Sequence, residues 1–132
     1  DTTIKINLTL KNNKNIKIFC DYEQISRVIL NLIKNSIESI REKAQKIKDF
    51  DKIIDIEIIK ISDYIVIEIS DNGVGFRDQQ IEKLIRPYYT TKEKGSGLGL
   101  SIVNKIINDH NGSINFYSIK TGAKVQLILP IK

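Results

Sequence analysis

The chain has 132 residues, of which 41% are hydrophobic and 28% charged, and its formal net charge is +5. This predicts one globular domain with a single hydrophobic core. The lysines are scattered rather than blocked, and no apolar run is long enough to span a membrane, so we expect no nucleic-acid ligand and no membrane contact by this domain. A solvated basic surface and a basic site for phosphates or an acidic partner both remain open.

Cys20 is the only cysteine, which excludes an intrachain disulfide and suits a reducing, cytoplasmic location. No signal peptide is evident, and the chain begins directly in a strand-like pattern. We therefore expect residues 1–132 to be a single domain that is a piece of a longer protein.

Strands are predicted from alternating or β-branched apolar runs, and helices from apolar residues spaced three and four apart. In chain order we predict a half-buried strand over 3–10, a short strand over 16–20, a helix from Asp21 to about 46, strands over 53–61 and 64–70, a short helix over 79–85, a loop over 86–96, a helix over 97–110, and strands over 113–119 and 123–129. Each successive pair of strands is expected to form a hairpin.

The expected fold class is α+β, a two-layer α/β sandwich with a mixed, mostly antiparallel sheet and helices on one face. Asp21 and Gln24 have the capping-box spacing that starts the first helix. Asn111 and Gly112 are expected to end the last helix, with Gly112 at the position that needs a left-handed backbone.

Two amides lie one turn apart on the first long helix. Asn31 and Asn35 share a face, and their neighbours Leu32 and Ile37 are apolar, so the pair borders the core, where a buried amide needs a partner. An amide oxygen combined with phosphate oxygens suits Mg²⁺. In an Asn-rich chain, the same two residues could also be plain surface amides. The adjacent Lys34 is either a phosphate contact or simply exposed.

Asp71 follows an apolar strand and precedes Asn72, Gly73 and, two residues later, Gly75. A partly desolvated carboxylate at a strand end can accept a hydrogen bond from the exocyclic amine of adenine, and it would repel the carbonyl that guanine has there. Gly73 and Gly75 allow a positive φ and a close approach of the base. Taken alone, Asp-Asn-Gly is also an ordinary turn signal.

A glycine run over residues 95–100 opens the last helix, where exposed N–H groups can bind phosphates. The run does not follow a strand and lacks Gly-Lys-Ser/Thr, which argues against a Rossmann fingerprint and a P-loop. The segment before this run carries hydroxyl groups and one ammonium group, on Tyr89, Thr90, Thr91 and Lys92. These groups could contact phosphates, or the segment could be a solvated loop. His110 ends the helix and is expected to have a capping or surface role, because no catalytic or zinc-binding spacing surrounds it.

Together and in this order, the motifs resemble the catalytic, ATP-binding domain of sensor histidine kinases, within the GHKL (Bergerat) ATPase superfamily. The resemblance covers the N box at 31–40, the G1 box at 71–76, the F-box region at 86–92, the G2 box at 95–103 and the final strand at 125–130. Residues 90–100 resemble nitrogen-regulation sensors of the NtrB and NtrY type most closely.

The resemblance implies ATP and Mg²⁺ as cofactors, with Asn35 as the metal ligand, Asp71 as the adenine contact and Lys92 as a phosphate contact. Asn35 and Lys92 would be the catalytic residues, and 77–96 would form a lid over ATP. The implied nucleotide-binding set is Asn31, Lys34, Asn35, Asp71, Gly73, Gly75, Tyr89, Thr90, Thr91, Lys92, Gly95, Gly97, Leu98, Gly99 and Leu100.

Three departures from the family pattern concern different parts of the domain. Leu84 and Tyr88 replace the F-box phenylalanines, Glu38 replaces a common lysine, and Ala123 replaces a common threonine. The altered F-box region and Glu38 keep open a second hypothesis, a nucleotide-binding regulatory module of the same fold without kinase competence.

By the same resemblance, this domain is the catalytic half of a protein-histidine kinase in a two-component system. It would donate the γ-phosphate to a histidine on its own dimerisation domain in a homodimer, and a response regulator receiver domain would then accept the group. ATP-hydrolysing relatives carry a glutamate as general base at the position of Asn31, and an amide cannot take that proton. We therefore expect no efficient hydrolysis, which disfavours a hydrolytic chaperone or DNA-repair ATPase. This sequence shows no candidate helix with an H box, so we also expect no self-phosphorylation.

Overall fold

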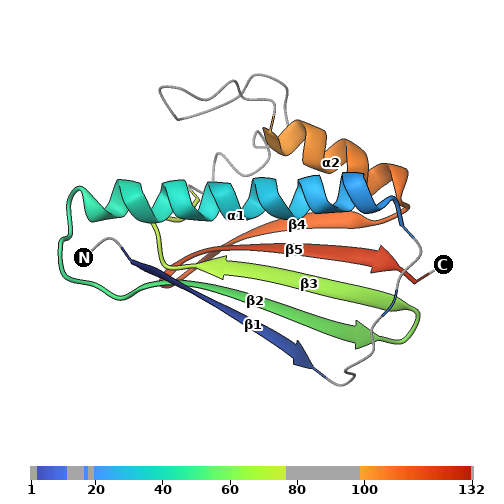
Figure 1. Cartoon of the computed structure of the whole chain (residues 1–132), viewed down its shortest axis with the longest axis horizontal. Helices are drawn as coiled ribbons and strands as arrows, with labels where there is room; N and C mark the ends of the chain where they lie inside the picture. The colour runs from blue at the N-terminus through green and yellow to red at the C-terminus, as the bar shows by residue number, and fades with distance from the viewer. Residues whose placement is uncertain (1–2, 12–16, 18–19, 77–98, 132) are drawn as a thin grey trace.

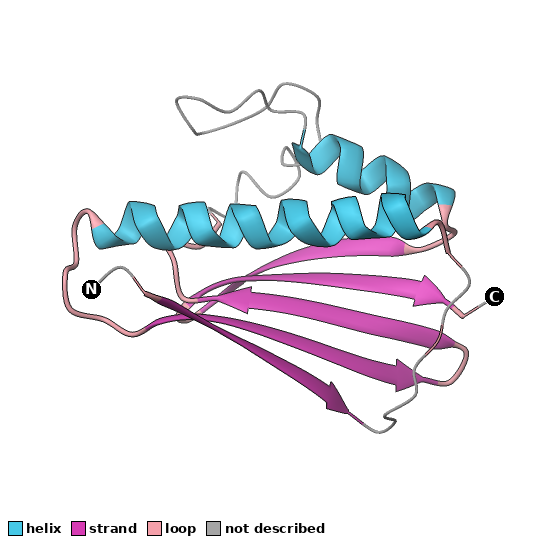
Figure 2. Cartoon of the chain, in the orientation of Figure 1, coloured by secondary structure: helices cyan, strands magenta, loops and turns pink. Residues whose placement is uncertain are grey.

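The structure is a computed structural model that describes residues 3–11, 17, 20–76 and 99–131. In these residues the elements are, in chain order, β1 (Ile4–Lys11), α1 (Tyr22–Ala44), β2 (Lys52–Ile61), β3 (Tyr64–Asp71), α2 (Gly99–Asp109), β4 (Ser113–Ile119) and β5 (Gly122–Pro130). The strands form one sheet in the order β1-β2-β3-β5-β4, and both helices lie on the same face (Figures 1 and 2). The predicted two-layer α+β sandwich is confirmed. The expected short helix over 79–85 and the loop over 86–96 lie outside the described residues.

The first strand pairs differently from the prediction. β1 runs parallel to β2, with Ile4 opposite Lys52, so the expected hairpin between β1 and residues 16–20 is wrong. Within 16–20, residues 17 and 20 carry no strand, and the other three lie outside the described residues. A parallel pair needs a crossover connection, which α1 supplies by carrying the chain across the helical face. The other three strand pairings are antiparallel, as expected.

The two helices begin and end at local capping signals. Asp21 caps α1, because its side chain accepts a hydrogen bond from the Gln24 N–H at 3.0 Å. α2 ends in a Schellman motif, in which the Gly112 N–H bonds to the Ile107 carbonyl at 2.9 Å. The left-handed residue of that motif is Asn111, with φ 60°, and not Gly112 as predicted. The predicted start of this helix at residue 97 lies outside the described residues.

Gly112 is needed for space. A Cβ there would lie 2.5 Å from the carbonyl oxygen of Ile128, so the end of α2 can lie against β5 only without a side chain at this position. In the described part of the chain, no helix combines the length and the apolar character of a membrane span.

The hydrophobic core fills the space between the helices and the sheet. α1 packs over β2 and β3, and α2 packs over β4. The least exposed large side chains come from both layers and include Val28, Ile40, Ile54, Ile69, Val103, Ile107, Leu127 and Leu129. Because side chains alternate along a strand, burial of Ile69 directs Asp71, two residues later, toward the helices as well.

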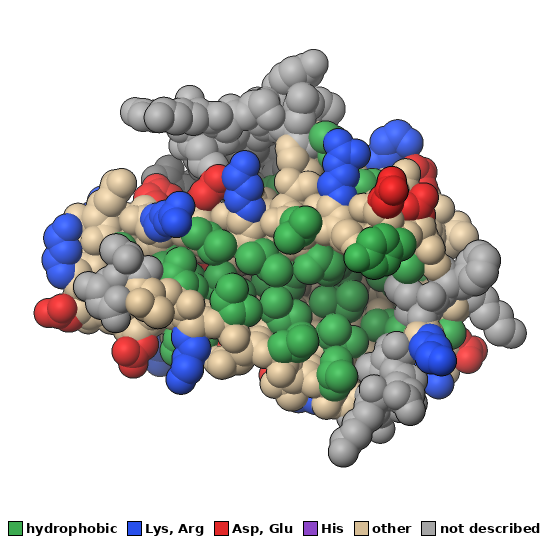
Figure 3. All heavy atoms as spheres, in the orientation of Figure 1, with side chains coloured by type: hydrophobic (Ala, Val, Ile, Leu, Met, Phe, Trp, Pro, Cys, Tyr) green, Lys and Arg blue, Asp and Glu red, His purple; other side chains and the backbone are tan. Residues whose placement is uncertain are grey.

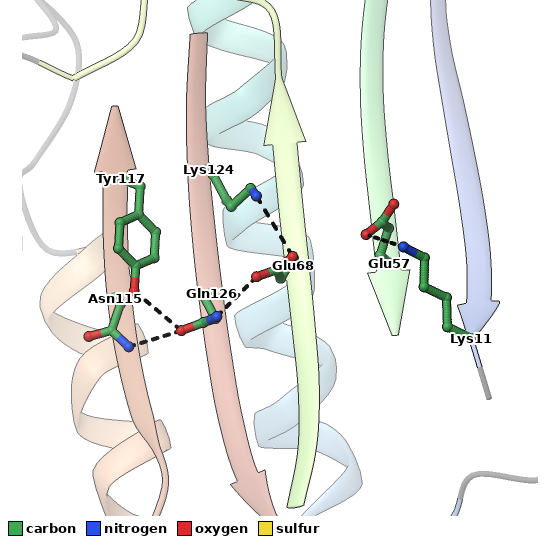
Figure 4. A network of polar contacts seen from close by, with 7 residues as sticks. All are labelled: Lys11, Glu57, Glu68, Asn115, Tyr117, Lys124 and Gln126. Atoms are coloured by element: carbon green, nitrogen blue, oxygen red, sulfur yellow. Dashed lines mark hydrogen bonds and ion pairs between the residues drawn. The ribbon is translucent and has the colours of Figure 1, made fainter. Parts of the chain in front are cut away.

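The opposite face of the sheet carries the polar contacts that Figure 4 shows. On this face Gln126 donates a hydrogen bond to Glu68 at 2.9 Å, and Lys124 lies 3.8 Å from the same carboxylate. At the edge, Lys11 pairs with Glu57 at 3.3 Å. Such partly exposed pairs contribute little stability, about 0–1 kcal/mol each. The candidate site lies on the helical face, where Asp71 meets Ser36 of α1.

Candidate functional site

Asp71 is the last residue of the central strand β3. It pairs with Ile54 of β2 and Ala123 of β5, and it is only 7% exposed. Its Oδ1 accepts a hydrogen bond from the Gly73 N–H at 2.9 Å. The Ser36 hydroxyl of α1 and the Ala123 backbone also hydrogen-bond to the carboxylate. The sheet and α1 together therefore hold this carboxylate in a defined orientation.

Burial raises the pKa of Asp71 above its ordinary value of 3.8, because removal from water disfavours the charged form. The hydrogen bonds from Gly73, Ser36 and Ala123, together with the charge of Lys43, lower the pKa but do not cancel the effect of burial. A carboxylate has about four acceptor positions, so this one can still accept a hydrogen bond from a ligand amine.

Asn72 anchors the loop that follows β3. Its Oδ1 accepts a hydrogen bond from the Ile53 N–H at 2.9 Å, and its Nδ2 donates to the Asp51 carbonyl. The Asn72 carbonyl accepts a hydrogen bond from the Lys43 ammonium at 2.9 Å. Asn72 therefore extends the pairing of β2 and β3 beyond Asp71 and serves the structure of the loop.

Gly73 and Gly75 are required for different reasons. Gly75 has φ +79°, as predicted, whereas Gly73 is not in the left-handed region, so the positive φ expected there is wrong. A Cβ on Gly73 would lie 2.3 Å from Ser39 Oγ and 2.7 Å from the Ser39 carbonyl carbon. In addition, the Val74 N–H donates a hydrogen bond to Ser39 Oγ at 3.0 Å. Gly73 is thus needed because α1 lies directly against the loop.

Asn31 lies beside the first turn of α2. Its Oδ1 is 3.7 Å from the position that a Cβ on Gly99 would occupy, and its Nδ2 donates to the Arg27 carbonyl at 3.0 Å. Asn35 follows one turn later on the same helix and is half-buried, while Lys34 is exposed. Since Ser36, the next residue, hydrogen-bonds to Asp71, α1 brings the predicted metal ligand and the predicted adenine contact into one region.

The remaining predicted contacts are only partly described. Gly99 and Leu100 form the first turn of α2 and are half-buried. The other predicted phosphate and lid contacts lie outside the described residues: Tyr89, Thr90, Thr91, Lys92, Gly95, Gly97 and Leu98.

Three site residues were missed by sequence reasoning: Ser36, Ser39 and Lys43. All three contact Asp71 or the loop after it. They continue the three- and four-residue spacing of the buried face of α1, where the preceding core residues Val28 and Leu32 are apolar. Polar side chains at positions where the helical spacing expects apolar core residues could have indicated these contacts.

A cavity of about 520 Å³ lies next to the same loop. It is lined by Lys43, Phe50 and Asp51, by residues 72–76 and by the turn at 119–122. The Lys43 ammonium lies 4.7 Å from the centre of the Phe50 ring. Gly73 and Gly75 of the predicted nucleotide-binding set line this cavity, whereas Asp71 and the two asparagines of α1 do not, so the cavity includes only part of the predicted site.

His110 has a structural role, which confirms the capping prediction. Its Nδ1 lies 2.8 Å from the Ile106 carbonyl, and its Nε2 accepts a hydrogen bond from the Asp21 N–H at 3.1 Å. The ring therefore ties the end of α2 to the start of α1, with both nitrogens engaged.

Residues 20–132 match a protein family described as histidine kinase-, DNA gyrase B-, and HSP90-like ATPase. The chain belongs to this ATPase family. It is 34% identical over 126 residues to sporulation kinase B of Bacillus subtilis, covering 95% of this chain and 28% of that protein. It is 33% identical over 112 residues to the nitrogen regulation protein NtrY of Azorhizobium caulinodans, covering 85% of this chain and 14% of that protein.

Among solved structures, the nucleotide-free catalytic domain of the histidine kinase ThkA is similar, with a TM-score of 0.84 and 27% identity over 98% of this chain and 80% of that one. The expected membership of the histidine kinase catalytic domains is confirmed, and the relatives of this ATPase domain include a nitrogen regulation protein beside a sporulation kinase. The chain spans less than a third of the length of these curated kinases.

Proposed function

We propose that this ATPase-family domain binds ATP with Mg²⁺ and donates the γ-phosphate to a histidine on the dimerisation domain of the full-length protein. The observation that carries the proposal is the buried Asp71 carboxylate, held by Ser36 of the helix that also bears Asn35. A fixed acceptor of this kind suits the amine of adenine and disfavours the carbonyl of guanine. Membership of the ATPase family supports the same ligand.

The donor set fits a magnesium ion that arrives with the nucleotide. Asn35 offers an amide oxygen on a half-buried flank of α1, and Mg²⁺ prefers a few hard oxygen ligands, waters and phosphate oxygens. Within the described ranges, no group of three or more His, Cys, Asp or Glu side chains is arranged to hold a metal by itself. When bound, the ion would neutralise phosphate charge, which is its usual part in phosphoryl transfer.

Transfer to a side chain is favoured over hydrolysis. Asn31 stands where the hydrolytic relatives would need a general base, and its amide, which donates to the Arg27 carbonyl, cannot accept a proton from water. His110 is engaged at both ring nitrogens, so it does not suit the role of phosphoacceptor. We therefore place the acceptor histidine on the protein's own dimerisation domain, in a cytoplasmic homodimer, with a response regulator as the next acceptor.

Calorimetric titration with Mg–ADP and Mg–GDP tests the nucleotide site. Asp71→Asn should weaken Mg–ADP binding by about 10- to 100-fold, because it removes a charged hydrogen-bond partner worth about 1.5–3 kcal/mol. Asp109→Asn is the matched control, since Asp109 is an exposed partner of Lys105 at 3.1 Å. Unchanged ADP affinity in Asp71→Asn would rule out the proposed adenine contact.

Labelled ATP tests the transfer step. The full-length protein should form phosphohistidine on its dimerisation domain, whereas a His110→Gln variant of the full-length protein should be labelled equally well. Nucleotide binding without any phosphohistidine would favour the regulatory-module alternative. Loss of the label in His110→Gln, with folding retained, would place the acceptor in this domain and contradict the proposal.

A further inference from the structure

An uncovered apolar surface lies between α1 and β1. Figure 3 shows it as a continuous field of hydrophobic side chains below the helix. Ile6 is opposite Ile54, which is fully buried under the helices, so Ile6, Leu8 and Leu10 face the helical side of the sheet. Nevertheless they are 50%, 65% and 48% exposed. We call this surface, together with the facing flank of α1, the α1–β1 groove.

The facing flank of α1 is apolar too. Ile29, Ile33 and Ile37 lie on it, spaced by four residues, and all three are only partly buried against the core. Asn31 and Asn35 mark the other flank, which faces α2. α1 thus presents apolar side chains both downward to the sheet and sideways over β1, although the described part of the chain places a helix on one side of it only.

The groove has the character of an interior. The strict alternation of β1 is typical of a strand with one face in a core, and apolar side chains on an open edge strand favour association with other molecules. Removal of each such side chain from water stabilises the state in which the groove is covered. The groove follows α1, whose 23 residues extend about 34 Å, so its length suits a helix of similar size.

We propose that the groove is filled by an amphipathic helix of the same polypeptide, from the segment that precedes Asp1. The chain enters β1 at the end of the groove next to the C-terminal end of α1, so a short connection would bring a preceding helix into it (Figure 1). Curated relatives have more than two thirds of their length outside the matched part. Even the isolated ThkA catalytic domain has a fifth of its chain outside the match.

Cross-linking in the full-length protein identifies the occupant. Cys20→Ala removes the native thiol, and a short photoreactive group is then attached to the cysteine of Leu8→Cys. Mass spectrometry identifies the peptide to which this group cross-links. Tyr64→Cys is the matched control, because Tyr64 is 48% exposed but alternates to the opposite face of the sheet. We expect a cross-link from position 8 to a peptide preceding Asp1, within one molecule, and none from position 64 to that peptide. Mixing isotopically light and heavy protein separates intramolecular from intermolecular products.

Thiol reactivity gives a second readout that does not depend on the cross-linker. Leu8→Cys should react about tenfold more slowly than Tyr64→Cys in the native full-length protein, and equally fast in urea. A cross-link to another copy would show that a second molecule covers the groove, and a cross-link to a different domain would show another occupant. Full reactivity at position 8 would show an open groove. Each of these three results overturns the proposal.

Discussion

Gly73→Ala tests whether the close contact between α1 and the loop after β3 positions Asp71. The new Cβ would lie 2.7 Å from the Ser39 carbonyl carbon and 2.8 Å from the Ile40 nitrogen, both of which are backbone atoms. Ser39 Oγ, at 2.3 Å, could rotate away, but it would then lose its hydrogen bond with the Val74 N–H. The backbone contacts can be relieved only if the loop and the helix separate.

The loop movement that Gly73→Ala requires is small, but it is large enough to break a hydrogen bond of Asp71. Ordinary carbon contacts begin near 3.4 Å, so the loop has to move by about 0.7 Å. A displacement of that size along the hydrogen bond would stretch the 2.9 Å contact between the Gly73 N–H and Asp71 Oδ1 to about 3.6 Å, beyond hydrogen-bonding range. Overpacking of this kind costs about 1–3 kcal/mol of stability. We expect Mg–ADP affinity to fall by about tenfold or more, because the adenine contact loses its orientation.

Calorimetry with Mg–ADP and urea unfolding measure the two effects separately. Gly112→Ala is the matched control, because its Cβ would lie 2.5 Å from the Ile128 carbonyl oxygen, an equally severe clash. Ile128 pairs with Val66, whereas Asp71 pairs with Ala123 near the other end of β5. Gly112→Ala should therefore lower the urea midpoint but leave the affinity of the folded protein unchanged. Normal ADP affinity in a folded Gly73→Ala protein, or equal affinity losses in both variants, would refute the reasoning.

Three further predictions concern Asp71 and the helix ends. Ser36→Ala should lower Mg–ADP affinity about three- to tenfold, because it removes a hydroxyl partner of Asp71, and calorimetry measures the change. Because burial raises the pKa of Asp71, ionised Asp71 costs stability above its folded-state pKa, and this cost disappears as the pH falls through that pKa toward 3.8. As the pH falls through that window, the urea midpoint of the wild type should therefore rise relative to that of Asp71→Asn. A difference between the two midpoints that does not change with pH would contradict the raised pKa. His110→Ala should lower the free energy of unfolding by about 1–2 kcal/mol, because it removes one hydrogen bond to the Ile106 carbonyl of α2 and one to the Asp21 N–H at the start of α1. An unchanged unfolding curve would show that these two bonds are unimportant.

Apart from the strand over 16–20, the described elements and their order could be predicted from the sequence, because their signals are local. Asp21 and Gln24 lie three residues apart, and the capping bond between them forms within one turn. The hairpins of β2 with β3 and of β4 with β5 were predicted correctly for the same reason, because each is closed by a short turn. Asp71 could also be proposed as a ligand contact from the sequence, because it places a carboxylate at the end of an apolar strand.

Pairings and contacts between distant segments could not be predicted in this way. β1 pairs with β2, more than 40 residues later, and alternation shows only that a strand has an apolar face, not which strand lies beside it. The partners of Asp71 depend on where α1 crosses the end of β3. Only the packing of the helix on the sheet therefore shows that Ser36 hydrogen-bonds to Asp71. The need for glycine at position 73 was predicted from backbone preference, whereas the structure shows another cause: Ser39 of α1 takes the space of a side chain there. That contact depends on the distance between the helix and the loop. The residues and their order along the chain thus determine the chemistry that is available, and tertiary packing determines which of those residues meet.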